Sequence, residues 1–196
     1  MESEDMNQKH MMIRTVEDAE HLLTEIDDRI RTFGLSWLDD VKWSSPETRL
    51  YSRCFWYEFQ KFVVKYEISL REVSSRLEKN PSSIAQMIYR NTFPTEKIIR
   101  PVMTELSHRC PPSFDMVRFD LELKGIERSD VIRTFLTVDR RERQRVLSEF
   151  VVNENNRNSK TLRFVIQELK NLDEGELKQV QGFVAALRRT SPHHQI

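Results

Sequence analysis

The sequence is poor in the glycine that tight turns and phosphate-binding loops require. Only four glycines occur among its 196 residues. Two-residue β-hairpin turns depend on glycine, so a β-rich architecture is not expected. The glycine-rich nucleotide motifs GxGxxG and GxxxxGK[ST] are both missing from the chain. These absences argue against a nucleotide-dependent enzyme, and no pattern in the sequence predicts a cofactor.

Cysteine and histidine are scarce, and their spacing predicts no metal site. The two cysteines, Cys54 and Cys110, stand far apart, and no histidine lies at a ligand spacing from either. His193 and His194 are adjacent, but they fall in a polar tail. No serine, cysteine or histidine has the surroundings typical of a nucleophile. We therefore expect reduced thiols, no bound metal and no enzymatic activity.

Long apolar runs are missing as well. No stretch approaches the roughly 20 apolar residues that cross a bilayer. The first ten residues, MESEDMNQKH, are polar and acidic, unlike a secretory signal. Charged residues make up 32% of the chain and apolar residues 38%, a balance that favours a helix-rich globular protein. We expect a mainly α-helical, cytoplasmic protein without membrane contact.

Positive and negative charges balance overall, yet they are unevenly distributed. The chain holds 31 lysines and arginines and 31 aspartates and glutamates. Residues 1–40 carry 4 basic and 11 acidic side chains, a net charge of −7, whereas residues 61–100 carry 8 basic and 4 acidic ones, a net charge of +4. Phosphate contacts supply much of a protein's affinity for DNA. The basic segment is therefore the candidate nucleic-acid site.

Two short helical patterns with a tight turn between them occupy residues 69–90 of this basic segment. Val73 and Leu77 lie four residues apart, which places them on one face of a first helix. The same spacing separates Ile84 from Ile88 in the second pattern. Each helix therefore has one apolar stripe and one polar side.

Capping residues predict where these two helices begin. Ser69 begins the first helix, and Glu72 three residues later completes a capping box. Asn80 is a good N-cap, because its side chain accepts a backbone N–H of the next turn. Pro81 then falls at the first helical position, where its missing N–H costs nothing. The second helix is therefore predicted over residues 81–90.

This arrangement resembles the helix-turn-helix unit of lambda-repressor-like regulators and, equally, that of ParB-type partition proteins. Those families have an apolar residue and then a small one in the first helix, as Val73 and Ser74 are here. An apolar residue closes that helix, as Leu77 does. Further matches are Ile84 and Ile88 in the second helix and the start of another helix at Phe93-Pro94-Thr95-Glu96.

The turn departs from the family pattern at two positions. It usually opens on glycine, which adopts a left-handed conformation freely, but here the residue is Glu78. For a residue with a side chain that conformation costs roughly 1–2 kcal/mol. The apolar residue that usually follows is replaced by Lys79.

The resemblance implies that the second helix enters the major groove of double-stranded DNA. Gln86 can form two hydrogen bonds with adenine, and Arg90 can hold a phosphate. Arg71 and Arg76 lie on the first helix, which crosses the DNA backbone, so their expected partners are phosphates. The alternative is that these residues are merely exposed polar side chains. The complete predicted DNA-binding set is Arg71, Arg76, Lys79, Asn80, Ser82, Ser83, Gln86 and Arg90.

Apolar and charged residues alternate in residues 116–124, a period of two that is typical of a β-strand. A single strand needs a partner, and a second subunit would supply one. A strand followed by two helical patterns resembles the ribbon-helix-helix dimer fold. The segment is also compatible with a helix, since its Glu, Leu and Lys residues are good helix formers.

Paired capping residues predict four more helix starts outside residues 69–90. In each pair a Ser, Thr or Asp precedes an Asp or Glu by three residues, as in a capping box. Pro101 lies inside a further helical pattern, where it predicts a kink or a break. The pairs are Thr15 and Asp18, Ser44 and Glu47, Asp139 and Glu142, and Asp173 and Glu176.

These patterns predict a helical domain at 14–109, a dimerisation region at 113–190 and tails at 1–13 and 191–196. We expect a homodimeric, sequence-specific DNA-binding regulator of transcription from a bacterium, phage or plasmid. One alternative is an accessory protein of plasmid partition or replication. Another is a helical adaptor that binds protein and not DNA, which the zero net charge and the acidic first helix favour. No small-molecule effector is evident.

Overall fold

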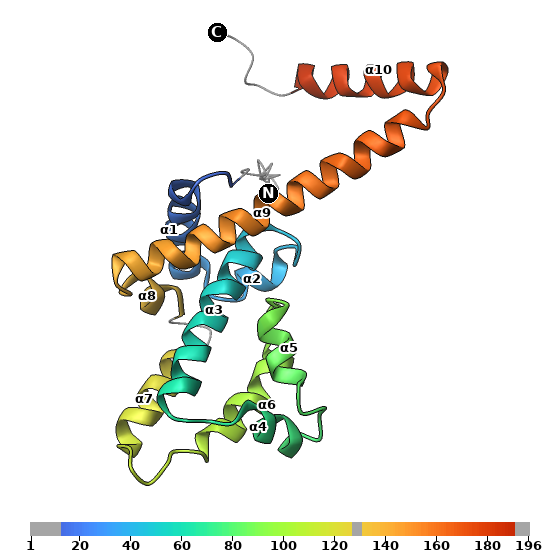
Figure 1. The fold of residues 1–196 in the computed structure, drawn as a ribbon. Helices are drawn as coiled ribbons and strands as arrows, with labels where there is room; N and C mark the ends of the chain where they lie inside the picture. Colours follow the sequence, from blue (N-terminus) through green and yellow to red (C-terminus); the bar gives the residue numbers. More distant parts are fainter. Residues whose placement is uncertain (1–12, 127–130, 191–196) are drawn as a thin grey trace, which may run out of the picture. The chain divides into compact units, whose positions relative to one another are not determined.

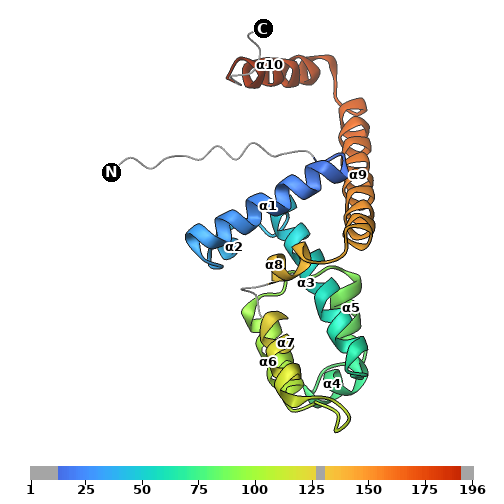
Figure 2. The ribbon, with the colours of Figure 1, turned by 90° about the vertical axis from the view of Figure 1, so that its left-hand side faces the viewer.

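The computed structural model describes residues 13–126 and 131–190, and within these ranges the chain is helical without a β-strand (Figures 1 and 2). The predicted mainly α fold is therefore confirmed. None of the described helices is both long and apolar enough to cross a membrane. The helices are α1 (Val16–Phe33), α2 (Trp37–Asp40), α3 (Pro46–Lys65), α4 (Leu70–Arg76), α5 (Ser83–Tyr89), α6 (Glu96–Ser107), α7 (Met116–Ile126), α8 (Val131–Leu136), α9 (Arg140–Lys170) and α10 (Glu174–Thr190).

Two compact units divide the chain, and the division falls between Val152 and Asn153, inside α9. The first unit contains the buried core, to which helices on both sides of residues 110–112 contribute. Whether a folding boundary lies at residues 110–112, as the sequence predicts, stays a prediction. We describe each unit by itself.

Helix α3 is the centre of the first unit, and α1, α7 and α8 pack against it (Figure 1). Its side chains are unusually apolar and aromatic, and burial of such surface is the main favourable contribution to folding. The fully or almost fully buried apolar and aromatic residues of α3 are Leu50, Tyr51, Cys54, Phe55, Trp56, Phe59, Phe62 and Val63.

The N-terminus of α3 lies one residue later than the capping pair predicts. Ser45, not Ser44, is the N-cap, and its side chain accepts a hydrogen bond from the backbone N–H of Thr48. Pro46 then occupies the first helical position, which suits its missing N–H. The prediction of Ser44 is wrong because it ignored the position that Pro46 prefers.

The capping pairs predicted for α1, α9 and α10 agree with the structure. Thr15 and Asp18 form a capping box at α1, and Asp139 Oδ1 accepts backbone N–H groups of the first turn of α9. At α10, the backbone N–H of Glu176 donates to Asp173, while the Glu176 carboxylate accepts from the backbone N–H of Asp173. Helix α6 runs on through Pro101 without a break.

Residues 116–124 form part of helix α7, so the predicted strand and its pairing between subunits are wrong. Phe119, Leu123 and Ile126 are buried at helical spacing. Val117 and Leu121, which a strand would place on the same face as Phe119, are 68% and 65% exposed. The alternation misled because the helix leaves two large apolar residues in solvent. The strand that the ribbon-helix-helix resemblance requires is absent from these residues.

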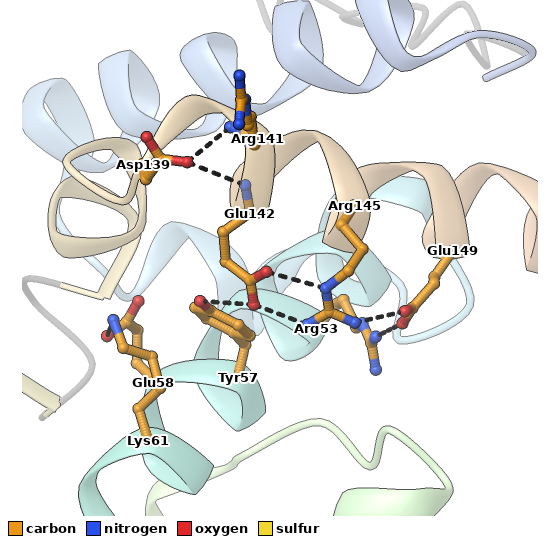
Figure 3. Close-up of polar contacts among 9 residues, drawn as sticks. All are labelled: Arg53, Tyr57, Glu58, Lys61, Asp139, Arg141, Glu142, Arg145 and Glu149. Atoms are coloured by element: carbon orange, nitrogen blue, oxygen red, sulfur yellow. Dashed lines mark hydrogen bonds and ion pairs between the residues drawn. The ribbon is translucent and has the colours of Figure 1, made fainter. Parts of the chain in front are cut away.

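Polar contacts fasten the first turns of α9 to α3 (Figure 3). The Tyr57 hydroxyl donates to Glu142 at 3.1 Å, and Arg145 pairs with the same carboxylate at 2.7 Å. Arg145 and Arg53 both pair with Glu149. Hydrogen bonding to Arg145 lowers the pKa of Glu142 to about 2. Burial, together with the contact to Glu142, raises the pKa of Tyr57 to about 12.

The second unit consists of the end of α9 followed by α10, and many of its apolar side chains are exposed. Isolated helices of this length are marginal in water unless an apolar face is covered. The large exposed apolar residues are Leu162, Phe164, Val165, Ile166, Phe183 and Val184.

The helical reading of α7 predicts different costs for two truncations two residues apart. Phe119→Ala removes a ring that packs 4.7 Å from Tyr66 and 5.0 Å from Phe62, measured between ring centroids. We expect a loss of about 3–5 kcal/mol in the free energy of unfolding, measured by urea denaturation. The control Val117→Ala should change it by less than about 0.5 kcal/mol. Similar losses for both variants would contradict the helix and favour a strand.

Candidate nucleic-acid interface

Helices α4 and α5 pack against each other and are joined by a short turn, residues 77–82. The Ser69 hydroxyl accepts the backbone N–H of Glu72, so the predicted cap of α4 is confirmed. Helix α4 ends at Arg76, with Leu77 as the C-cap residue. Glu78 has a φ of 55°, the left-handed conformation that its position in place of glycine predicts.

Helix α5 begins two residues later than expected, at Ser83 and not at Pro81. Asn80 still supports this end, because its Oδ1 accepts the backbone N–H of Ser82 at 3.0 Å and the Ser82 hydroxyl at 2.8 Å. The asparagine thereby closes a turn before the helix and does not cap the helix itself. The prediction misplaced the boundary because this local turn competes with the first helical turn.

A buried hydroxyl connects the two helices. Ser74 is fully buried in α4, and its Oγ accepts the backbone N–H of Ile84 at 3.4 Å. Ile84 is fully buried as well, so the start of α5 is fixed by both an apolar and a polar contact. The resemblance predicts a small residue at position 74, but the hydrogen bond of its hydroxyl forms only when the fold brings α4 and α5 together.

Side chains of α3 hold the loop that follows α5. The Trp56 indole N–H donates to the backbone carbonyl of Thr92 at 2.6 Å. The Asn91 side chain donates to the backbone carbonyl of Arg49 at 3.0 Å. The ring of Phe93, which is only 7% exposed, packs against Tyr51 with 6.1 Å between the centroids. These contacts tie the pair α4–α5 to the buried core.

The polar side of α5 points to solvent, opposite Ile84. Gln86 and Arg90 lie four residues apart on this side, and both are exposed. Gln86 donates from Nε2 to the Ser82 hydroxyl at 3.0 Å, which extends the chain of hydrogen bonds from Asn80. Of the eight predicted residues, the seven exposed ones are Arg71, Arg76, Lys79, Asn80, Ser82, Gln86 and Arg90, while Ser83 is partly buried.

Arg76 differs from the other predicted residues because carboxylates surround it. Its guanidinium lies 3.6 Å from Glu72 and 3.9 Å from Glu105. Arg109 pairs with both carboxylates, at 2.9 Å and 2.8 Å, and hydrogen bonding to Arg109 lowers the pKa of Glu72. Arg76 is therefore a weaker candidate for a phosphate contact than Arg71, which has no such ion pair with a residue that the structure describes.

Sequence reasoning missed exposed residues near this surface and also Arg109, which forms ion pairs beside it. Tyr89 on α5 is 91% exposed, and its spacing of three from Gln86 was the available signal. Lys97 on α6 is an exposed basic residue, whereas Arg100 of the same helix pairs with Glu96 and lines a groove between α6 and α7. Arg109 was missed because it is far in sequence from Glu72, and only the fold brings the two together.

The described residues hold no group of three or more histidine, cysteine, aspartate or glutamate side chains that would bind a metal. Cys54 and Cys110 are free thiols. No family model, no curated protein and no solved structure matches this chain significantly. The function must therefore be inferred from the residues of this chain and their geometry.

The hydroxyl of Ser74 gives a direct test of how α5 is positioned. Ser74→Ala leaves the Ile84 N–H without its acceptor in a buried place, so we expect a loss of about 1–3 kcal/mol in the free energy of unfolding. The control is Ser75→Ala, whose exposed hydroxyl donates to the Arg71 carbonyl, and it should cost less than about 0.5 kcal/mol. Equal effects of the two variants in thermal or urea unfolding would contradict a bracing role for Ser74.

Proposed function

We propose that residues 69–90 are a helix-turn-helix and that the protein is a sequence-specific, homodimeric DNA-binding regulator of transcription. The main support is the two-sided character of α5. Its inner residue, Ile84, is fully buried, while Gln86 and Arg90 project from a rigid scaffold into solvent. Helix-turn-helix proteins present their second helix to the major groove with this geometry.

The charges around α5 suit a DNA backbone. Arg71 on α4, Lys79 in the turn and Arg90 at the end of α5 are exposed basic residues. Lys97 on α6 is a further exposed basic residue. Lysines and arginines that neutralise phosphates release bound counterions, and this release drives association in dilute salt.

In this proposal Gln86 reads the base sequence. Its side-chain amide can bond the N6 and N7 of adenine together. To do so it must exchange its present hydrogen bond to the Ser82 hydroxyl for the base, which costs little at an exposed site. Ser82 and Ser83 are short enough to contact phosphate or base edges, and Asn80 lies close to the backbone in the same arrangement.

Dimer formation would come from the second unit. Its exposed apolar residues, among them Leu162, Ile166 and Phe183, need a covering surface, and a second copy of the chain supplies one. A two-fold dimer would place two α5 helices on half-sites about 34–36 Å apart, or a multiple of that distance. The binding site would then be roughly palindromic.

Salt dependence tests this function. We expect the full chain to bind mixed-sequence duplex DNA at low salt and to lose affinity steeply as salt rises, with log K linear in the logarithm of the salt concentration. Arg90→Gln should reduce the magnitude of that slope by about one for each subunit bound, because one phosphate contact is removed. Fluorescence anisotropy at several salt concentrations measures both slopes.

The matched control is Arg163→Gln, an exposed arginine in the second unit that should leave the slope unchanged. The absence of binding even at low salt would refute the proposed function. An equal change of slope for Arg163→Gln would refute the assignment of the DNA contact to α5.

A further inference from the structure

A groove of about 990 Å³ runs along the first unit, between α3 and α7. Residues 57–65 of α3 form one side, and residues 121–126 of α7 form the other. Thr134 of α8, with Glu142 and Arg145 of α9, closes one end. The groove is separate from the polar face of α5, and none of the predicted DNA-binding residues lines it.

Two large apolar side chains are exposed on the wall of the groove, among polar residues that include Gln60 and Lys61. Val64 of α3 is 76% exposed, and Leu121 of α7 is 65% exposed. Phe62 and Ile126 extend this wall and are themselves buried. Apolar side chains lining a concave site are the usual setting of a small-molecule pocket, with a few polar groups fixing the orientation of the ligand.

Most charged side chains of the groove already have close partners. Lys65 pairs with Glu122 at 2.5 Å, and Arg145 pairs with Glu142 at 2.7 Å. Lys61 lies 3.4 Å from Glu58, so each basic side chain that lines the groove has a carboxylate neighbour. Glu58 differs from the other two carboxylates because one of its oxygens has no hydrogen-bond partner among the described residues.

Glu58 is only 6% exposed, and its Oε1 has no hydrogen-bond partner among the described residues. Its other oxygen lies 3.4 Å from Lys61 Nζ, at the long limit of a hydrogen bond (Figure 3). Burial raises the pKa of this carboxyl group. A buried acceptor without a donor is costly and uncommon in proteins, so a donor from outside the chain would be strongly favoured here.

We propose that the groove binds a small organic amine, whose apolar body lies against Val64 and Leu121 and whose ammonium group donates to the Glu58 carboxylate. Because Glu58 Oε1 is enclosed by protein atoms, the side chain turns toward the groove when the amine binds. The ammonium ion then supplies the hydrogen bond that Oε1 lacks, in addition to the contact that Lys61 makes with the other oxygen. A carboxylate ligand would instead meet Glu58 with like charge. The proposal does not depend on DNA binding, and its test does not use DNA.

Three ligands with one apolar body and different head groups test the proposal on the full chain. The probes are 2-phenylethylamine, 2-phenylethanol and phenylacetate, titrated by calorimetry near neutral pH. We expect the amine to bind about ten- to a hundredfold more tightly than the alcohol, the ratio that a charge-assisted hydrogen bond supplies. Phenylacetate should not bind. Equal affinities for the three probes, or no binding of the amine at millimolar concentration, would refute the proposal.

Two variants locate the binding site. Glu58→Gln keeps the shape of the side chain but removes its charge, so the preference for the amine over the alcohol should disappear. Gly125→Leu fills the groove, and a Cβ atom added at Gly125 has no neighbour within 4 Å, so the larger side chain meets open space. We expect Gly125→Leu to abolish binding of the amine and the alcohol alike, without lowering the unfolding midpoint.

The control Glu17→Gln, an exposed carboxylate on α1, should bind the amine as the unaltered protein does. Unfolding midpoints of all variants show whether a lost affinity reflects lost folding. Amine affinity that is unchanged in Gly125→Leu, or an amine preference that persists in Glu58→Gln, would contradict binding at this groove.

Discussion

Burial of the aromatic helix α3 is the constraint on which the rest of the first unit depends. Trp56 and Phe59 lie in its centre, almost or fully buried, and helices from before and after α3 pack on it. Trp56 also reaches out of the core to hold the Thr92 carbonyl. Thr92 lies three residues after the end of α5, so this hydrogen bond ties the core to the loop that follows the candidate DNA-binding helix.

The same helix has two different edges. Toward its N-terminal half it anchors the loop after α5, and toward its C-terminal half it forms the wall of the groove that contains Glu58. The first edge contacts the loop that follows α5, and the polar residues on the outer side of α5 are exposed to solvent. The second edge holds a carboxylate that the fold has buried without a complete set of donors. We propose different ligands for the two sites, a polyanion at α5 and a small cation at Glu58.

Local features of this fold were predictable from the sequence, and features that depend on distant contacts were not. The caps of α1, α4, α9 and α10 and the left-handed Glu78 depend on a few neighbouring residues, so the sequence located them. The starts of α3 and α5 were placed one and two residues too early, because a neighbouring proline and a local turn decide them. The alternation in residues 116–124 was ambiguous, because packing on α3 and not local pattern decides that Phe119 is inside and Val117 outside. The ion pairs of Arg109 and the groove at Glu58 arise only when separate helices meet.

We propose that the outer face of α5 distinguishes one DNA sequence from another. Two affinities test this proposal, one for a duplex selected from random sequences and one for an unselected duplex. Both are measured for the unaltered protein and for Gln86→Ala. If Gln86 reads a base, the substitution weakens binding to the selected duplex by about 1–3 kcal/mol and changes binding to the unselected one little. Equal losses on both duplexes would show that Gln86 reads no base and would refute sequence recognition by this residue.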